Sequence, residues 1–395
     1  MNAPAPNAAT LLDHFLAIAV AQDASDIHLS PGLPPHVRVH GELRPLADAT
    51  PLVPAELEQI AAELLGRMAH RAVSNPDLAS ALAARGSADG AMTSPEGVRY
   101  RFNIFRRQSE LAIALRRLED HFRTLGDLGL PESLYGLCQL RDGLVIVSGP
   151  TGAGKSTTLA ALLDYINRNR SGHIITIEDP IEYIHARVRC VINQRQVGLD
   201  APTFNDALVA SLRQDPDVVL VGEIRDLETI RTAITAAETG HLVLTTLHAG
   251  DCVGSVERLV SVFPSGEQEG IRRQLSLVLR GIIAQHLLPG QPAPGAPADE
   301  LPKRVVASEI LTVTPAVANL IATGRSAQIY SAMEAGATAG MQTMEQDLAR
   351  LWVGGRISET TAEVMARNAS ILRDRAALLR RRLAGHGQAK NGGAA

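Results

Sequence analysis

The sequence contains few aromatic residues and few cysteines. Aromatic side chains make up 3% of its 395 residues, whereas 45% of the residues are hydrophobic, which is ample for sizeable cores. The three cysteines, Cys138, Cys190 and Cys252, lie far apart, and none belongs to a CxxC pair. Their spacing excludes a disulfide framework and a cysteine-rich zinc site, and it fits a reducing cytosol.

Neither an excess of basic charge nor a long uncharged apolar run is present. The 38 Lys and Arg face 42 Asp and Glu, so the formal charge of −4 argues against a polyanion binder acting through overall charge. We therefore expect no direct binding of nucleic acid. Polar residues interrupt the two best candidates for a spanning helix, Leu11–Val20 and Leu275–Leu288, and neither approaches ~18 uncharged apolar residues. Because residues 1–15 also lack the features of a signal peptide, we expect a soluble intracellular protein.

Two or three domains are expected from the length. Residues 1–120 mix helical periodicity with alternating apolar and polar residues and read as a small α+β domain. Its expected helices begin at Leu11 and span Ala55–Met68, and its expected strands include 27–29, 36–46, Val98–Phe105 and Leu111–Leu118. The alternation stops at residues 121–127, where Gly126 favours a hinge.

Short, wholly apolar runs separated by helical stretches follow the hinge. The runs LVIVSG, IITIED, VVLVGE and LVLTTLH indicate buried strands of a mostly parallel sheet, so residues 128–370 read as an α/β domain. The segment 291–302 is a Pro/Ala/Gly loop, and the remainder is expected to be mainly helical. Residues 371–395 form a basic tail, for which we expect disorder; contact with anionic lipid or with a partner is the alternative.

One glycine-rich segment matches the phosphate-binding pattern G-x-x-x-x-G-K-[ST] in full, between an apolar strand and a helix. Glycines let backbone N–H groups face phosphate oxygens, and the helix N-terminus adds its dipole. We expect Lys155 to reach the β and γ phosphates of ATP and the Ser156 hydroxyl to coordinate Mg²⁺. The predicted nucleotide-binding residues are Gly149, Pro150, Thr151, Gly152, Ala153, Gly154, Lys155, Ser156 and Thr157.

Acidic residues follow two of the predicted strands. Gly222 stands where many P-loop proteins carry an aspartate, so Glu223 is the candidate for organising the metal and the attacking water. Glu178, Asp179 and Glu182 follow another strand and are further candidates for orienting the water. Solvated acids at strand ends are the alternative for all four residues.

His241 and His248 flank the run LVLTTL, one at each end. At three strand residues per ~10 Å, they lie too far apart to share one metal. A γ-phosphate sensor or a contact to a neighbouring subunit is the functional interpretation. Capping or surface histidines are the alternative.

Together these segments resemble the secretion ATPase superfamily, which contains motors of type IV pili, type II secretion and type IV secretion. The superfamily's Walker A motif, Asp box (TIEDPIEY), atypical Walker B motif and His box follow one another between Gly149 and Asp251. SDIHLSPGLPPHVRVHGELRPL and GMQTMEQDLARLWVGGRIS are similar to PilT-type retraction ATPases. The resemblance covers residues 10–365, and it implies a PAS-like α+β domain followed by a RecA-like P-loop ATPase domain with a helical C-terminal part.

The resemblance also implies roles for individual residues. Glu182 would be the catalytic glutamate and Glu223 the Walker B glutamate, while His241 and His248 would belong to the His box. Family members are homohexamers whose sites are completed by arginines, because a guanidinium suits the charge on a transferring phosphoryl group. The positions that match are Arg99, Arg101, Arg116 and Arg195; salt-bridged strand arginines are the alternative.

The implied function is that of a cytoplasmic motor ATPase that hydrolyses Mg-ATP and powers type IV pilus retraction, and hence twitching motility. Its partners would be further copies of the chain, a platform protein of the inner membrane, with which it associates peripherally, and a second PilT- or PilU-like ATPase. The stretch Ala316–Thr323 keeps the Asn-Leu-Ile core of the family's AIRNLIRE-like segment but lacks its arginines and final acid. This departure leaves open a PilU-like accessory ATPase, or a motor for type II secretion, type IV secretion or conjugation.

Overall fold

The computed structural model describes residues 10–39, 42–46, 49–69, 82, 86–118, 122–292 and 304–391, in two compact units. The first unit extends to His121 and includes Asp179–Ile184 and Gln196–Asp200; the second holds the rest of the chain. Within the described residues, none of the helices combines the length and hydropathy needed to cross a bilayer. The start of the predicted hinge, most of the predicted 291–302 loop and the last four residues lie outside the described residues.

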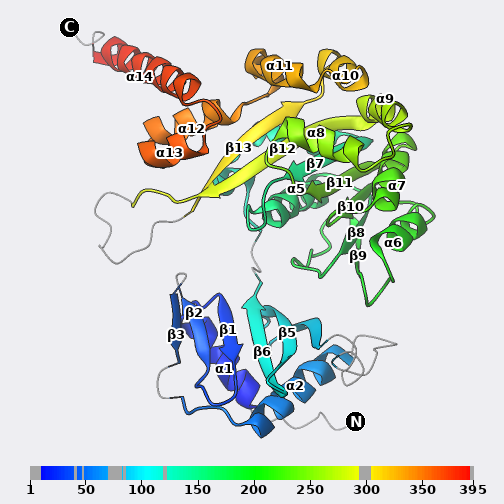
Figure 1. Ribbon diagram of the computed structural model, residues 1–395, viewed down its shortest axis with the longest axis vertical. Helices are drawn as coiled ribbons and strands as arrows, with labels where there is room; N and C mark the ends of the chain where they lie inside the picture. Colours follow the sequence, from blue (N-terminus) through cyan, green and yellow to red (C-terminus); the bar gives the residue numbers. More distant parts are fainter. Residues whose placement is uncertain are drawn as a thin grey trace. The chain divides into compact units, whose positions relative to one another are not determined.

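Among its described residues, the first unit consists of an antiparallel sheet and the helices that accompany it (Figure 1). The strand order is β3-β2-β1-β6-β5-β4. Thr10 caps the first helix in a reciprocal pair with Asp13. In chain order the elements are α1 (Leu11–Ala21), β1 (Asp26–Leu29), β2 (His36–Val39), β3 (Glu42–Pro45), α2 (Pro54–Ala69), β4 (Ser87–Thr93), β5 (Arg99–Arg107) and β6 (Glu110–Arg117).

Alternation along the strands places the core of this unit on one face of the sheet. On β5, Tyr100, Phe102 and Ile104 are buried, whereas Arg101 between them is exposed. The buried residues join side chains of α1 and α2 in one apolar cluster. The sequence therefore predicted β5 and β6 well, but it missed β4, whose Gly90 and Asp89 are unusual in strands.

The second unit contains the P-loop and all of the C-terminal elements. In chain order these are α4 (Leu125–Leu128), η1 (Glu132–Gln139), β7 (Gly143–Ser148), α5 (Lys155–Asn169), β8 (His173–Glu178), β9 (Val191–Gln196), α6 (Phe204–Ser211), β10 (Val218–Val221), α7 (Leu227–Glu238), β11 (Leu242–Leu247), α8 (Cys252–Ser261), α9 (Gln268–Val278), β12 (Leu279–Leu288), β13 (Val305–Thr312), α10 (Pro315–Ala322), η2 (Ser326–Gln328), α11 (Ile329–Ala335), η3 (Ala337–Ala339), α12 (Met344–Val353), α13 (Glu359–Met365) and α14 (Ala369–Asn391).

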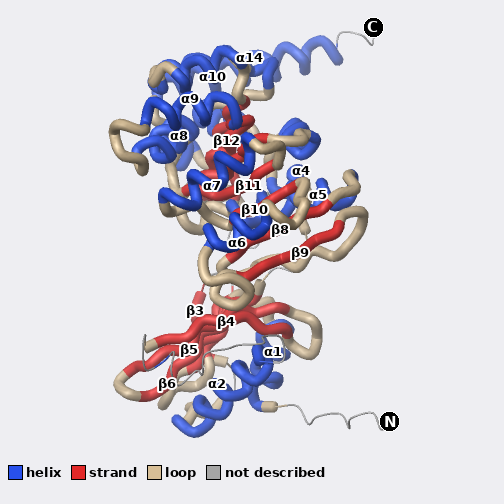
Figure 2. Tube along the Cα trace, turned by 90° about the vertical axis from the view of Figure 1, so that its right-hand side faces the viewer, coloured by secondary structure: helices blue, strands red, loops and turns tan. Residues whose placement is uncertain are grey.

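The sheet of the second unit has the order β13-β12-β7-β11-β10-β8-β9. The five strands from β12 to β8 are parallel, and β13 runs antiparallel to β12 at one edge. Every residue of β7 is buried, and Figure 2 shows the strands of this sheet between helices. The predicted α/β class with a mostly parallel sheet is confirmed.

The region after the 291–302 loop is mainly helical, as expected, although it begins with β13, which extends the sheet. One expectation about the C-terminal part is wrong. The basic tail is not disordered along 371–391, which belongs to α14. Leu372 and Ala376 anchor α14 by packing in a buried cluster with α12.

The three cysteines are free thiols, and all are buried. Burial raises the pKa of Cys138 to about 12 and also raises the pKa of Cys190 and of Cys252. These thiols therefore serve as small apolar side chains of the second unit.

Candidate nucleotide site

The P-loop connects the buried strand β7 to α5, as the sequence predicts. Gly149, Gly152 and Gly154 have φ angles of +147°, +78° and +88°, which side chains rarely adopt. A Cβ on Gly149 would lie 2.3 Å from the backbone oxygen of Gln285. The loop thus depends on glycine both for its conformation and for its close approach to β12.

Lys155 is the first residue of α5, and its side chain turns back over the loop. Its Nζ donates hydrogen bonds to the backbone oxygens of Gly149 (3.0 Å) and Pro150 (2.9 Å). Lys155 is only 9% exposed, whereas the next residue, Ser156, is exposed. A buried ammonium at a helix N-terminus favours an anion, and the Ser156 hydroxyl is accessible to a metal ion.

Sequence reasoning missed Gln285, which holds the P-loop from β12. Its side chain is fully buried and donates to the backbone oxygen of Ala153 (2.6 Å) while accepting from the hydroxyl of Thr158 (2.9 Å). A polar residue amid the apolar run Leu279–Leu288 was the available signal, because a buried amide needs partners. Gln285 therefore ties the loop and the first turn of α5 to the sheet.

Parallel strand direction brings Glu223 and His248 to the same sheet edge as the P-loop. Glu223 follows β10 and His248 follows β11, and both strands run parallel to β7. Nε2 of His248 lies 3.8 Å from Oε2 of Glu223, which also pairs with Arg225 Nε at 2.7 Å. The structure thus assembles a lysine, a glutamate and a histidine at the carboxyl ends of neighbouring strands, where α/β sheets bind ligands.

His248 is held as a neutral imidazole. Partial burial and the positive charge of Lys155 lower its pKa, and the opposing effect of Glu223 is smaller. A neutral ring at neutral pH has one nitrogen that donates and one that accepts a hydrogen bond. It can therefore contact a phosphate oxygen or a water without adding a full charge.

His241 lies at the opposite end of β11, beside the first residue of β7. The backbone N–H of Gly143 donates to the oxygen of His241, and the His241 ring contacts the oxygen of Ala236. At ~3.3 Å per strand residue, the two histidines are about 20 Å apart. His241 does not join Glu223 and His248 within one chain.

The remaining acidic candidates lie around β8. Glu178 ends that strand and accepts hydrogen bonds from Thr176 (2.6 Å) and Gln194 (3.3 Å). Asp179 and the half-buried Glu182 belong to the short segment 179–184 that groups with the first unit. Glu178 is thus engaged by its neighbours in the second unit.

The predicted arginines divide between the two units. Arg195 on β9 donates to the oxygen of Ala207 (3.2 Å) in the second unit. Arg101 and Arg116 are directly paired in register on β5 and β6 and are both exposed, on the face of the first unit's sheet opposite its core. Arg99 is two residues from Arg101 and therefore points to the same face, where it is half-buried.

Asp26 anchors Arg116 on this face. Its carboxylate accepts from Nε of Arg116 at 2.8 Å and lies 3.8 Å from Nε of Arg38. Burial alone would raise the pKa of Asp26, but hydrogen bonds from Ser25 and Arg116 outweigh it and lower the pKa. The face thus carries a set of guanidinium groups, of which Arg116 is held in place by the carboxylate of Asp26.

Comparisons with known proteins agree with this geometry. The family model described as type II/IV secretion system protein matches residues 5–350. The type IV pilus retraction ATPase PilT of Pseudomonas aeruginosa is 41% identical over 356 residues, which cover 90% of this chain and 98% of that protein. The type IV pilus ATPase PilU of the same organism is 38% identical, with 91% of this chain and 90% of that protein covered.

A solved structure supports the same relationship. The crystal structure of the pilus retraction motor PilT with bound ADP matches with a TM-score of 0.81 and 40% identity, covering 91% of this chain and 98% of that chain. The predicted resemblance to PilT-type secretion ATPases is confirmed. The chain belongs to the type II/IV secretion system protein family and is a secretion ATPase related to PilT.

Proposed function

We propose that the protein is a hexameric motor that hydrolyses ATP with Mg²⁺ to power retraction of a type IV pilus. The observation that carries the proposal is the convergence of Lys155, Glu223 and His248 at one sheet edge, in a chain that is 41% identical to a PilT. The P-loop supports nucleotide binding, and Glu223 and His248 provide the carboxylate and the imidazole that hydrolysis needs in addition.

The residues at the sheet edge fit a magnesium-bound nucleotide. Mg²⁺ prefers oxygen ligands and is commonly held by substrate phosphates together with one or two protein oxygens. The accessible hydroxyl of Ser156 and the carboxylate of Glu223 would be these oxygens. When bound, the ion neutralises charge that develops on the phosphate oxygens.

Protein groups would then divide the remaining work. Backbone N–H groups of the P-loop and the Lys155 ammonium bind the phosphates, and Glu223 orients the attacking water. His248, neutral and next to Glu223, contacts the γ phosphate or the water and so distinguishes ATP from ADP. Glu182 is the proposed catalytic glutamate, which takes up a proton from the water as the water oxygen bonds to the γ phosphorus and the bond from that phosphorus to the oxygen of the leaving ADP breaks.

In the proposed assembly, arginines supply charge that a single P-loop lacks. The exposed pair Arg101 and Arg116, with Arg99 beside them, and Arg195 would complete the site as in the ring-forming relatives, and His241 would contact a neighbouring subunit. The proposed functional division is a 1–120 domain, a 121–127 hinge, a 128–370 ATPase domain and the C-terminal segment 371–395. We further propose cytoplasmic action at an inner-membrane platform protein.

A second candidate is a PilU-like accessory ATPase that assists a partner motor. The observation that favours it is α10, where Ala318, Ala322 and Thr323 replace the arginines and the acid of the family's segment. Val317 and Ile321 keep the buried face of that helix, so only its charged groups are lost. Turnover by the purified chain, alone and with a partner ATPase, separates the two candidates.

Pilus counts in a strain that lacks the gene test the proposed function. We expect excess surface pili, reversed by the wild-type gene but not by Lys155→Ala, because removal of the ammonium abolishes hydrolysis. Pilus-free cells would instead indicate an assembly motor. Unchanged piliation would favour the accessory role or a secretion motor, and near-normal ATP turnover by Lys155→Ala would overturn the site assignment.

A further inference from the structure

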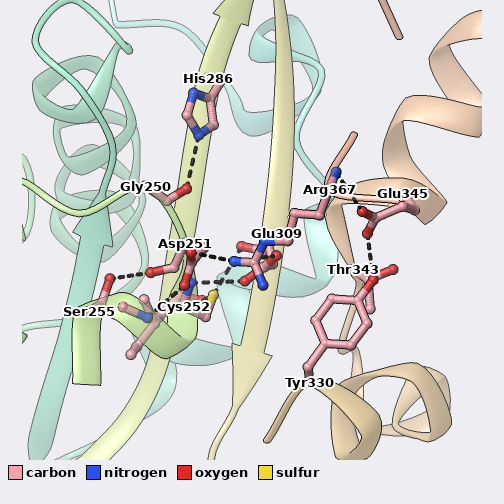
Figure 3. Close-up of polar contacts among 12 residues, drawn as sticks. Gly250, Asp251, Cys252, Ser255, His286, Glu309, Tyr330, Thr343, Glu345 and Arg367 are labelled. Carbon is pink, nitrogen blue, oxygen red and sulfur yellow. Dashed lines mark hydrogen bonds and ion pairs between the residues drawn. The ribbon is translucent and has the colours of Figure 1, made fainter. Parts of the chain in front are cut away.

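Four residues, His248–Asp251, connect β11 to α8, and we call this segment the His248 loop. Its last residue, Asp251, caps α8, since its Oδ1 accepts from the N–H of Gly254 (2.6 Å). Nε2 of His286, on β12, donates to the oxygen of Gly250 (2.9 Å; Figure 3). The far end of the loop is therefore held by contacts that do not involve the P-loop.

Arg367, in the turn between α13 and α14, contacts this end of the loop. Its guanidinium forms an ion pair with Oδ2 of Asp251, leaving Oδ1 to cap α8, and lies 3.9 Å from Oε2 of Glu309 on β13 (Figure 3). Arg367 lies beyond residue 350, where the family match ends.

Glu309 gives Arg367 a fixed position. Its side chain is fully buried, and Oε1 accepts from the N–H of Cys252 (2.8 Å), the residue that follows Asp251. Burial raises the pKa of Glu309, and the charge of Arg367 opposes that rise. A buried carboxylate is costly without a cation nearby, so Glu309 and Asp251 together favour one placement of the guanidinium.

The backbone of Arg367 is fixed from the C-terminal helices. Oε1 of Glu345, on α12, accepts from the N–H groups of Arg367 (3.0 Å) and Asn368 (3.3 Å). The hydroxyl of Tyr330 on α11 donates to the other oxygen of Glu345, and the Arg367 guanidinium lies 5.6 Å from the centre of the Tyr330 ring. Contacts from α11, α12 and the α13–α14 turn thus converge on a single arginine.

We propose that Arg367 is a positioning residue for ATP hydrolysis, which links the C-terminal helices to the His248 loop and so keeps His248 beside Glu223. The proposal rests on the proposed function for its catalytic consequence. Without the guanidinium, Asp251 loses its ion pair and the loop gains freedom three residues from His248. Nucleotide binding depends on the P-loop, which Gln285 holds separately, so the turnover rate and not the affinity should change.

Hydrogen exchange and steady-state kinetics on the full-length chain test the proposal. In Arg367→Ala we expect faster exchange of the amides of 248–254, a fall in kcat of about tenfold or more, and nearly unchanged KM and ADP affinity. Arg367→Lys, which keeps a cation, should recover part of kcat. The matched control is Arg373→Ala, which removes an exposed arginine of α14 paired with Glu363 at 2.7 Å.

Unchanged exchange at 248–254 in both Arg367 variants would overturn the proposal, whether or not the chain hydrolyses ATP. So would faster exchange with an unchanged kcat, or equal loss of kcat in Arg373→Ala. If Arg367→Ala does not fold, as judged by its thermal transition, amide exchange and kcat are instead compared between Arg367→Lys, Arg367→Gln and the wild type. Absence of turnover in the wild-type chain would contradict the proposed function, while the exchange measurement still decides whether Arg367 holds the loop.

Discussion

Gln285 and His286 are consecutive residues of β12, and their side chains bind two different loops of the candidate site. Gln285 donates to the oxygen of Ala153 in the P-loop, and His286 donates to the oxygen of Gly250 in the His248 loop. Successive side chains of a strand point to opposite sides. One strand thus sets the position of both loops from within the sheet.

Gln285→Leu should weaken nucleotide binding and stability together. The Ala153 oxygen and the Thr158 hydroxyl would lose a buried partner, which costs about 1–3 kcal/mol in the free energy of unfolding. Titration with a fluorescent ADP analogue and denaturant unfolding measure the two effects. Gln274→Ala, at a half-buried glutamine of α9 that bonds Glu238, is the control and should change neither. Wild-type affinity in Gln285→Leu would contradict the role assigned to Gln285.

Glu223→Gln should separate binding from hydrolysis. The amide keeps the shape of the side chain but cannot orient water as a carboxylate does, so kcat should fall by about a hundredfold or more. ADP affinity should stay near the wild-type value, because the P-loop is intact. Glu228→Gln, an exposed acid in the first turn of α7, serves as the control. A variant Glu223→Gln with normal turnover would remove Glu223 from the mechanism.

Gly149→Ala should disrupt the P-loop. Its φ of +147° disfavours a side chain, and the new Cβ would meet the Gln285 oxygen at 2.3 Å. Backbone strain of this kind costs about 1–3 kcal/mol, and nucleotide binding should be lost. Gly266→Ala, at a position with no atom within 4 Å of the added Cβ, should bind nucleotide normally. Calorimetric titration with ADP compares the affinities of the two variants. Tight ADP binding by Gly149→Ala would refute the prediction that the loop requires glycine at this position.

The buried His185 should make the second unit less stable in acid. It is 8% exposed, its ring lies beside that of Phe122 with the centres 4.6 Å apart and the planes tilted by 32°, and burial lowers its pKa from 6.5 to about 4. The unfolded chain therefore binds more protons than the folded one between these pH values. The contribution of the neutral His185 ring to the free energy of unfolding is fully present above pH 6.5 and is lost as the pH falls towards 4. At pH 5 the loss is about 2 kcal/mol.

Urea unfolding followed by Trp352, the single tryptophan of the sequence, measures this loss in the second unit. His185→Phe keeps a ring beside Phe122 and should reduce the difference in unfolding free energy between pH 7.5 and pH 5. The wild-type chain unfolded at both pH values gives the reference difference. An unaltered pH dependence in His185→Phe would show that another group is responsible.

Local sequence patterns predicted the parts of the fold whose signals lie within a few residues. The P-loop sequence specifies its own glycine conformations, and wholly apolar runs such as Val218–Val221 identify buried strands. Parallel direction then placed Glu223 and His248 together, since both follow such strands. No comparable local signal marks β12, because its apolar run follows a helical stretch.

The remaining site contacts join residues distant in the sequence. Gln285 bonds Ala153 across 132 positions, and Arg367 reaches an aspartate on a different element. Each depends on the strand order of the sheet or on the packing of the C-terminal helices, neither of which has a short-range pattern. The same reasoning explains why the sequence predicts a disordered tail where α14 forms: the basic charge of this segment is evident in the sequence, whereas the packing partners of Leu372 are not.

Burial of all three native thiols makes the unmodified chain a suitable background for site-specific labelling. A maleimide reacts with an accessible thiolate. Cys138, Cys190 and Cys252 are buried and their pKa values are raised, so they offer neither the access nor the thiolate. Cysteines introduced at exposed positions, such as Glu96 in the first unit and Glu269 in the second, would therefore react selectively. A pair of fluorophores or spin labels at these positions would follow the distance between the two units through a cycle of nucleotide binding and release.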